Sequence, residues 1–473
     1  MREKKEYMEL ARFAVEEAKR QGADETEAFI SDRLSVSINV SNREVEQVNS
    51  YRDAGIGLRL FDRKKQVFGS SNELSRDSIR SLISDLLRKV AFHTPDEFNT
   101  LTGKEGGTLE KDWSSYPDLL SYDPQLAEIP VSDKIKRALA MEGAGLDFSP
   151  KVTGSMFAMY QDTCALSYLA NSRGISGWFP SSGCQGFVIV SAAEGSDHQS
   201  GTYSKGYARY SAFSPEEVGR KAAENAVRML GAKPIASCEV PMVISPSVGV
   251  ELLTALVYGM LCADSVQQNQ SILSGKLGST VASDIVTLTD DGRLKGAMNT
   301  SPVDGEGVPL QTTPLIAGGV LKNYLYDSYT ARKGKTKSTG NRRRPDGLST
   351  GESSYQSAGW IGITNLYLDQ GILKPEEIVS TVSNGFYLNG AHGLNSAGIN
   401  YISGDFSLPV SGFMIEGGTI TYPVSGISIG GNLLDLLQSV DKIGNDLTWF
   451  TNVGCPTFSV NHIKISGAEN TGK

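Results

Sequence analysis

The chain has 473 residues and a formal net charge of −8, so it is long enough for two or more domains with a sizeable core. The acidic balance gives no support for a nucleic-acid-binding surface. No apolar run is long enough to span a bilayer, and the first residues lead into an amphipathic helix without a secretory h-region.

The five cysteines are few, odd in number and far apart, which argues against a disulfide framework. They are Cys164, Cys184, Cys238, Cys262 and Cys455. Together with the absence of a secretory signal, this pattern predicts a cytoplasmic protein.

The first hundred residues indicate strands between two amphipathic helices. Apolar residues recur at helical spacing over Tyr7–Ala18, and Ser75 is placed to cap a second helix. Between them, strict alternation predicts a half-buried strand at Leu34–Val40, and residues 56–61 and 66–70 resemble the arms of a hairpin. This order is typical of an α+β or α/β domain.

The next part of the first half is less regular. Residues 93–130 are rich in turn-forming types, which is typical of an insertion or a crossing loop. A helix is then expected at Asp133–Met141. Strands are expected at Val152–Tyr160, Thr163–Ala170 and Phe187–Ala192.

A helix with a strong start signal ends the first half. Ser214-Pro215-Glu216-Glu217 has the sequence of a capping box with proline at the first helical position, and Gly231 ends the helix. Ala232-Lys233-Pro234 indicates a linker. We therefore place an N-terminal domain at residues 1–232 and a C-terminal domain at residues 235–473.

The second half starts with a strand and an apolar helix and then becomes rich in glycine. The strand is expected at Val240–Ser245 and the helix at Val248–Met260. A hairpin is expected over Thr313–Tyr326, with its turn at Gly318-Gly319, and a short helix is expected from Pro375.

The glycine-rich stretch Asn400–Asp446 is the most informative part of this half. A hairpin is expected to turn at Gly417-Gly418, and Asn432 is placed to cap a short leucine-rich helix. Glycines inside strands indicate close approach of backbones or of a ligand, and a tightly packed β core is the simpler interpretation. The predicted fold is α+β: an N-terminal mixed α/β domain followed by a mainly antiparallel β domain with a few helices.

Few residues stand out as chemical groups. The four histidines are scattered, and none has the helical spacing of a metal motif. Asp304 and Glu306 are a pair suited to acid–base work or cation binding, although their turn-rich context favours a structural role. Arg342–Arg344 could bind a carboxylate or phosphate, and a solvated loop is the simpler interpretation. Cys184 stands in a glycine- and serine-rich setting where a thiol could be exposed.

Short motifs in a fixed order carry a resemblance to a known family. The chain resembles the TldD/TldE (PmbA) family, once called modulators of DNA gyrase, and the ordered set covers most of the chain. The motifs are Asn171–Gly174, Asp304–Val308, Gly319–Leu325, Ser338–Asn341, Gly404–Ser407, Ser411–Phe413, Gly431–Leu433 and Gly444–Asp446.

The resemblance implies a family with two kinds of subunit, of which one binds zinc. TldD-type subunits of the family carry His-Glu-x-x-x-His on the helix after the first strand of the second domain, and these histidines bind zinc with a later cysteine. Here the corresponding positions include Thr254, Ala255 and Gly259, which offer no ligand. The sequence context of Cys455 does not match that of the ligand cysteine. The chain therefore resembles a TldE/PmbA-type subunit without a metal of its own, with zinc expected in a TldD-type partner.

The implied function is to complete a zinc-dependent metallopeptidase heterodimer that cleaves extended peptides, with a homodimer formed when the chain is alone. Asp304, Glu306, Ser338, Thr339, Asn341 and Arg342 are candidate residues of the shared cleft or interface. Two alternatives remain open from the residues alone. They are a stand-alone peptide-binding module and a self-sufficient hydrolase that uses Cys184 or a serine.

Overall fold

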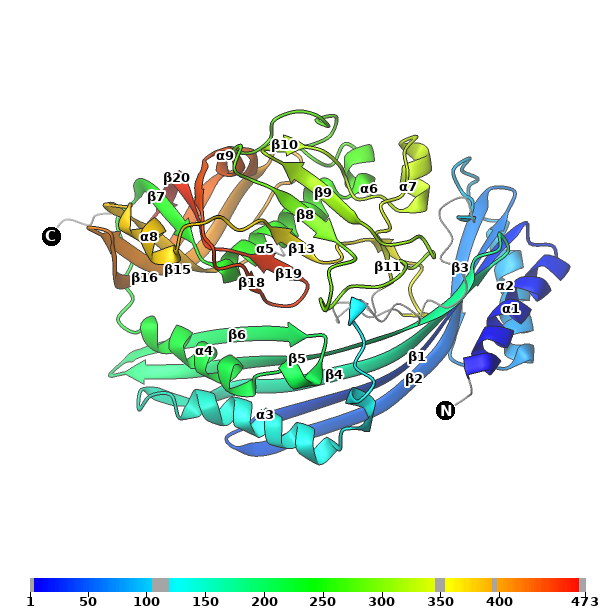
Figure 1. Cartoon of the computed structure of the whole chain (residues 1–473), viewed down its shortest axis with the longest axis horizontal. Coiled ribbons are helices and arrows are strands. Elements are labelled where there is room, and N and C mark those ends of the chain that lie inside the picture. The colour runs from blue at the N-terminus through cyan, green and yellow to red at the C-terminus, as the bar shows by residue number, and fades with distance from the viewer. Residues whose placement is uncertain (1–3, 104–118, 345–353, 394–397, 468–473) are drawn as a thin grey trace.

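The computed structural model describes residues 4–103, 119–344, 354–393 and 398–467. Its first half is built on one antiparallel sheet with the strand order β3-β2-β1-β4-β5-β6. The strands are β1 (Glu25–Ser41), β2 (Glu44–Asp62), β3 (Lys65–Ser71), β4 (Val152–Asn171), β5 (Ser176–Glu194) and β6 (Asp197–Tyr207). The long strands run along the whole length of the molecule (Figure 1).

Helices cover one face of this sheet, and the second half of the chain covers the other (Figure 1). The helices are α1 (Lys4–Arg20), α2 (Arg76–Val90), α3 (Val131–Leu146) and α4 (Pro215–Arg228). Successive side chains of a strand point to opposite faces. Ile30 and Ile38 of β1 therefore join the cores beneath the helices, whereas Phe29 packs with residues of the second half.

The predicted elements of this half are present, and several are longer than expected. Ser75 caps α2 by accepting a hydrogen bond from the backbone N–H of Ser78 at 3.1 Å. The two strands predicted at Val152–Tyr160 and Thr163–Ala170 are wrong as separate elements, because both belong to β4. Asp162 does not interrupt the strand, since its buried carboxylate pairs with Lys134 at 2.8 Å.

The start of α4 differs from the predicted capping box. Ser214 is the N-cap residue, but its side chain makes no capping hydrogen bond. Glu217, the expected reciprocal partner, instead accepts hydrogen bonds from Lys205 Nζ at 2.7 Å and from the Tyr207 hydroxyl at 3.3 Å. Tertiary contacts with β6 have replaced the local cap.

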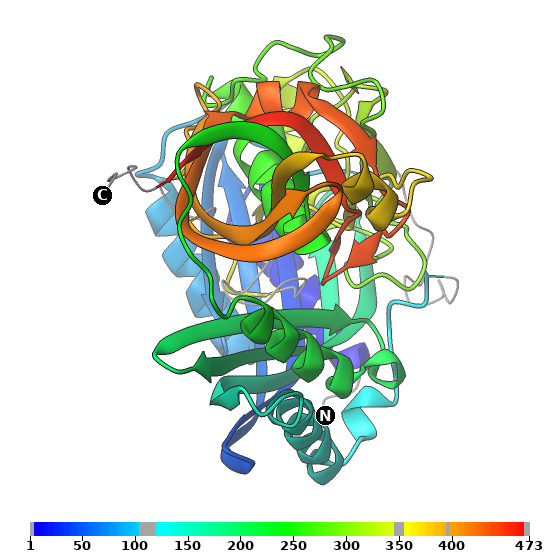
Figure 2. The same cartoon turned by 90° about the vertical axis from the view of Figure 1, so that its left-hand side faces the viewer.

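The second half contains a ring of strands (Figure 2). The strand order is β16-β15-β14-β7-β20-β17, and an additional pairing of β16 with β20 closes the ring. These strands are β7 (Cys238–Ile244), β14 (Asn384–Ala391), β15 (Asp405–Glu416), β16 (Thr419–Asn432), β17 (Val440–Ile443) and β20 (Phe458–Ser466). The β7–β14 pair is parallel and the other pairs are antiparallel.

A second sheet packs beside the ring, with the order β10-β9-β8-β13-β19-β18. Its strands are β8 (Leu288–Asp291), β9 (Thr312–Ala317), β10 (Val320–Leu321), β13 (Leu366–Leu368), β18 (Thr448–Trp449) and β19 (Val453–Cys455). A two-stranded ribbon is formed by β11 (Arg342–Arg343) and β12 (Trp360–Ile361). The helices of this half are α5 (Pro246–Leu256), α6 (Ala263–Gln267), α7 (Ser328–Lys333), α8 (Pro375–Ser380) and α9 (Leu433–Gln438).

The glycine-rich stretch forms the predicted hairpin and helix cap. Gly417 and Gly418 turn between β15 and β16 with φ values of 55° and 76°, a conformation that favours glycine. The Asn432 side chain accepts a hydrogen bond from the Leu434 backbone N–H and so caps α9. With helices packed on a sheet-dominated structure and a β-rich second half, the α+β prediction is confirmed.

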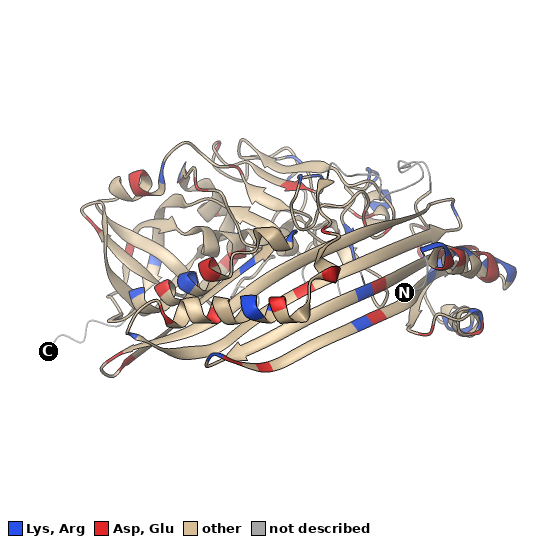
Figure 3. Cartoon of the chain, turned by 60° about the horizontal axis from the view of Figure 1, so that its bottom comes forward, with Lys and Arg blue, Asp and Glu red and all other residues tan. Residues whose placement is uncertain are grey.

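Charged side chains of both signs lie on the helices that cover the first sheet. In the view of Figure 3, residues of both signs alternate along α3 and α4. No helix within the described parts of the chain is long and apolar enough to cross a membrane.

Candidate functional site

The first sheet and the second half meet through a small apolar cluster. Strands β1, β4 and β5 contribute side chains from one side, and the segments around residues 303 and 355 contribute from the other. The members are Phe29, Leu169, Ile175, Phe179, Val303 and Tyr355. Glycines allow this close approach, since a Cβ on Gly57 would lie 2.2 Å from the Tyr355 carbonyl oxygen.

A buried ion-pair cluster lies beside these apolar residues. Arg59 of β2 donates to Glu27 at 2.8 Å and to Glu306 at 2.9 Å. Glu27 of β1 also accepts a hydrogen bond from Arg344. All four side chains are at most 4% exposed, so the two halves of the chain are joined by charge-assisted hydrogen bonds shielded from water.

Asp304 and Arg342 extend the cluster. Asp304 accepts hydrogen bonds from the backbone N–H groups of Glu306, Val308 and Arg342 at 2.8, 2.9 and 3.1 Å. Arg342 forms an ion pair with Asp327, at the start of α7. The structure therefore brings Asp304, Glu306 and Arg342 together in one network.

The two carboxyl groups of the network have opposite pKa shifts. Burial and the nearby Glu306 carboxylate raise the pKa of Asp304 to about 7. Burial also acts on Glu306, but Arg59 and Arg342 outweigh it and hold the pKa of Glu306 well below its ordinary value. Glu306 thus joins the two halves through Arg59, whereas Asp304 binds backbone groups within the second half, and the oxygens of both carboxyl groups accept hydrogen bonds from the protein.

The polar loop before β11 is folded rather than solvated. Asn341 donates to Asp290 at 2.7 Å and to the Gly362 carbonyl at 3.0 Å. Ser338 donates to the Tyr326 carbonyl at 3.2 Å, and Thr339 accepts from the Tyr326 backbone N–H at 2.7 Å. The simpler interpretation of the arginine run as a solvated loop is wrong for Arg344, which is 2% exposed, because its ion pair with the first sheet compensates its burial.

The helix that corresponds to the family's zinc motif ends in an irregular turn. After α5 the backbone continues as a π-helix over Val257–Leu261. The Thr254 hydroxyl donates to the Val250 carbonyl at 2.7 Å, and Ala255 is buried. A Cβ on Gly259 would lie 2.1 Å from the Tyr401 ring, so an aromatic side chain fills the space beside this position.

Cys455 is also placed in the packed interior. A Cβ on Gly249 of α5 would lie 2.5 Å from its Sγ atom, and burial raises the pKa of the Cys455 thiol. Among the described residues, no group of three or more His, Cys, Asp or Glu side chains could hold a metal ion.

Cys184 is not the exposed thiol that its sequence context suggested. It lies within β5, opposite Asp162 of β4, and is 1% exposed. Burial, and then the Asp162 carboxylate, raise the pKa of its thiol. A buried thiol of raised pKa is not a nucleophile at neutral pH, so the geometry does not support a cysteine hydrolase at this residue.

Two exposed aromatic side chains and an arginine form a surface that the sequence reasoning did not identify. Tyr258 on the π-helix is 41% exposed and Trp360 on β12 is 45% exposed. Trp360 lies opposite Arg343 in the β11–β12 ribbon. A Cβ on Gly362 would lie 2.9 Å from Arg343 Cγ and 3.3 Å from the Tyr258 hydroxyl, which places Arg343 and Tyr258 beside the same glycine. The segment Gly359-Trp360-Ile361-Gly362 was the available sequence signal.

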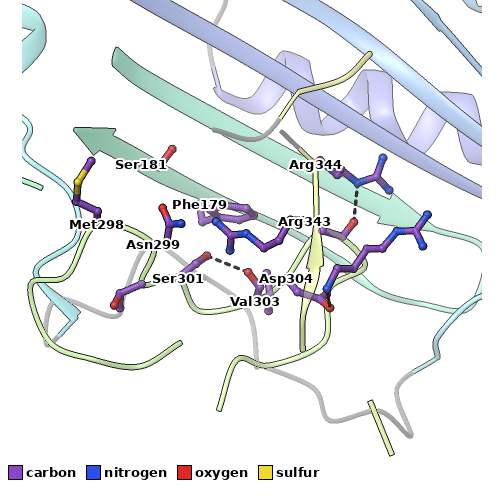
Figure 4. Close-up of a pocket in the computed structure, with 12 residues that line it drawn as sticks. Phe179, Ser181, Met298, Asn299, Ser301, Val303, Asp304, Arg343 and Arg344 are labelled. Atoms are coloured by element: carbon purple, nitrogen blue, oxygen red, sulfur yellow. Dashed lines mark hydrogen bonds between the residues drawn. The ribbon is translucent and has the colours of Figure 1, made fainter. Parts of the chain in front are cut away.

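Arg343 also lines a small cavity between the second half and β5. The cavity has a volume of about 20 Å³, and Arg342 and Arg344 line it as well. Figure 4 shows Arg343 beside Phe179, with Val303 and Asp304 nearby. Polar groups from Ser181, Asn299 and Ser301 face the same space.

Comparisons with known proteins agree with this architecture. Three family signatures match consecutive segments: PmbA/TldA metallopeptidase domain 1 at residues 26–89, the central domain at 124–230 and the C-terminal domain at 237–467. The metalloprotease PmbA of Escherichia coli O157:H7 is 26% identical over 446 residues, which cover 94% of this chain and 93% of that protein.

Two further relatives widen the comparison. A metalloprotease TldD homologue of Buchnera aphidicola is 26% identical over 390 residues, covering 79% of this chain and 76% of that protein. The crystal structure of TldE from Thermococcus kodakarensis has the same fold, with a TM-score of 0.82, 19% identity and coverage of 98% of this chain and 100% of that chain. Because the three family signatures follow one another along most of the sequence, the chain belongs to the PmbA/TldD metallopeptidase family.

Proposed function

We propose that this chain is the TldE/PmbA-type subunit of a two-chain zinc-dependent peptidase, in which a TldD-type partner holds the zinc. The observation that carries the proposal is the helix at the zinc-motif position. Thr254, Ala255 and Gly259 offer no metal ligand, and Tyr401 occupies the space beside Gly259. A helix that is packed in this way supports the fold of a subunit but supplies no Lewis acid of its own.

The exposed surface next to that helix supports a role in binding extended peptides. Tyr258 and Trp360 present large aromatic surfaces, and Arg343 lies between them and the cavity. Aromatic residues and arginine are the types that dominate binding energy at protein surfaces. An extended peptide would gain its affinity from main-chain hydrogen bonds and its register from such side-chain contacts.

The proposal is tested by purifying the chain alone and after co-expression with a TldD-type partner. We expect the isolated chain to bind no stoichiometric zinc and to cleave no casein or peptide. The co-purified complex is expected to contain one zinc site in the partner and to show chelator-sensitive cleavage. Stoichiometric zinc with chelator-sensitive cleavage in the isolated chain would contradict the proposal.

Assembly provides a second test. We propose a heterodimer with the partner in the cytoplasm and a homodimer when the chain is expressed alone, each with an interface above about 2,000 Å². Size-exclusion chromatography with light scattering measures both states. A chain that stays monomeric and ignores the partner at micromolar concentration would rule out this assembly.

The exposed aromatic residues also favour a second candidate, a stand-alone peptide-binding module. That function predicts peptide affinity without turnover, even after a TldD-type subunit is added. Addition of the partner therefore separates the two candidates in one experiment.

A further inference from the structure

Arg343 differs from both of its neighbours in the run of three arginines. Arg342 pairs with Asp327 and Arg344 pairs with Glu27. Within the described ranges of the chain, the Arg343 side chain makes no hydrogen bond and no salt bridge. Strand alternation explains the difference, because β11 turns Arg342 toward the buried network and Arg343 toward the opposite side.

The surroundings of the Arg343 guanidinium are partly dry and favour an anion. Burial lowers its pKa, whereas Tyr258, Asp290 and Asp304 act in the other direction, and an arginine keeps its proton in either case. Asp304 lines the same cavity, but its oxygens already accept three backbone N–H groups. A half-buried cation without a bonded partner is costly, and an incoming anion would remove that cost.

The size and composition of the cavity fit a carboxylate. A cavity of about 20 Å³ has room for about one water-sized group, which corresponds to one oxygen of a carboxylate. The planar guanidinium matches a carboxylate through two parallel hydrogen bonds, and the side chains of Ser181, Asn299 and Ser301 supply further polar partners. Phe179 and Met298 form the apolar part of the wall.

We propose that Arg343 anchors a carboxylate group of a bound peptide in this cavity, while Tyr258 and Trp360 contact the adjoining residues. The carboxylate comes either from the free C-terminus of the peptide or from an Asp or Glu side chain. The inference rests on the proposed function, because it names the substrate feature that the peptide-binding subunit recognises. The subunit would then select peptides by charge at one position, in addition to any main-chain recognition.

The test uses the assembled heterodimer and three fluorescein-labelled Ala/Gly hexapeptides in a fluorescence-anisotropy titration. The first peptide has a free C-terminus, the second is amidated, and the third is amidated and contains one internal Glu. Wild-type complex is expected to bind at least one carboxylate peptide about 10- to 100-fold more tightly than the neutral one, the range of a charge-assisted hydrogen bond. The carboxylate peptide that shows the preference identifies the source of the group.

Variants test whether the preference for a carboxylate peptide depends on Arg343. Arg343→Gln is expected to abolish the preference for a carboxylate peptide over the neutral one, and Arg343→Lys is expected to retain part of it because a lysine binds as a point charge. Arg220→Gln on α4 removes the same charge from an exposed helix surface and serves as the matched control. Thermal unfolding of each complex verifies that the variants are folded.

The outcomes separate the inference from the proposed function. Equal binding of all three peptides by the wild-type complex would overturn the inference, and so would a carboxylate preference that survives in Arg343→Gln. In both cases the role as a peptide-binding subunit would stand. If the complex binds none of the peptides, the proposed function fails and the inference fails with it.

Discussion

The ion-pair cluster of Glu27, Arg59, Glu306 and Arg344 and the surroundings of Arg343 use the same residue type in opposite ways, although Arg343 and Arg344 are adjacent in sequence. In the cluster, Arg344 and Arg59 both pair with Glu27 of β1, and the charges are shielded from water. Arg343 also lines the cavity, has no hydrogen-bond or ion-pair partner among the described residues, and lies near the exposed Tyr258 and Trp360. Arginine thus stabilises the fold where a carboxylate of the same chain pairs with it, as at Arg59 and Arg344. Within the part of the chain that the structure describes, Arg343 has no such carboxylate and is available for a ligand.

The largest expected effect comes from breaking the cluster at its centre. Glu27→Gln removes the charge that pairs with both Arg59 and Arg344, so the buried Arg344 guanidinium loses its carboxylate partner and Arg59 keeps only Glu306. We expect the free energy of unfolding to fall by about 3–5 kcal/mol, as measured by urea denaturation. Glu44→Gln, the same change at an exposed position of β2, is the control and should stay within about 0.5 kcal/mol of wild type. A loss below about 1 kcal/mol at Glu27 would show that the cluster does not hold the halves together.

The second prediction is the pH dependence of the cluster. Because the pKa of Glu306 is held below its ordinary value in the folded protein, its contribution to stability is present above about pH 4.5 and is lost as the pH falls toward the folded-state pKa. Wild type should lose about 1–3 kcal/mol more than Glu306→Gln across this window, the range of hydrogen bonds to a charged group. Urea unfolding at pH 6, 5, 4 and 3 measures the difference, and parallel curves for the two proteins would contradict the assignment.

The third prediction concerns the packing of Gly259, in the π-helix Val257–Leu261, against Tyr401. Gly259→Ala places a methyl group against the Tyr401 ring and should destabilise the protein by about 1–3 kcal/mol through overpacking. Tyr401→Ala in the same chain should recover part of this loss in a double-mutant cycle. Gly154→Ala is the control, because no atom lies within 4 Å of its added Cβ. Additive effects of Gly259→Ala and Tyr401→Ala would show that the ring does not fill this space.

The smallest effect on stability is expected from a substitution of Arg343 in β11. Arg343→Gln removes a cation that has no bonded partner, so the free energy of unfolding should rise by up to about 1 kcal/mol. The contrast with Glu27→Gln measures the difference between the two regions directly. A loss comparable to that of Glu27→Gln would place Arg343 in the structural network instead.

The local elements could be predicted from the sequence because their signals are short in range. The Ser75 and Asn432 caps, the Gly417-Gly418 turn and the apolar faces of the helices depend on residues within one or two turns of chain. Ser214 shows the limit of this reasoning. Its capping sequence is correct, but contacts of Glu217 with β6 replaced the local hydrogen bond.

The ordered motifs of the sequence determined the family, and the helix without metal ligands determined the type of subunit that we propose. Only the tertiary structure decided which of the polar residues are structural and which face a cavity. Glu27 and Glu306 are 279 positions apart yet share Arg59, and no local pattern reports a contact across that separation. Over the described residues, Arg342 and Arg344 find carboxylate partners in the fold, whereas their neighbour Arg343 does not, because adjacent side chains of β11 point to opposite faces.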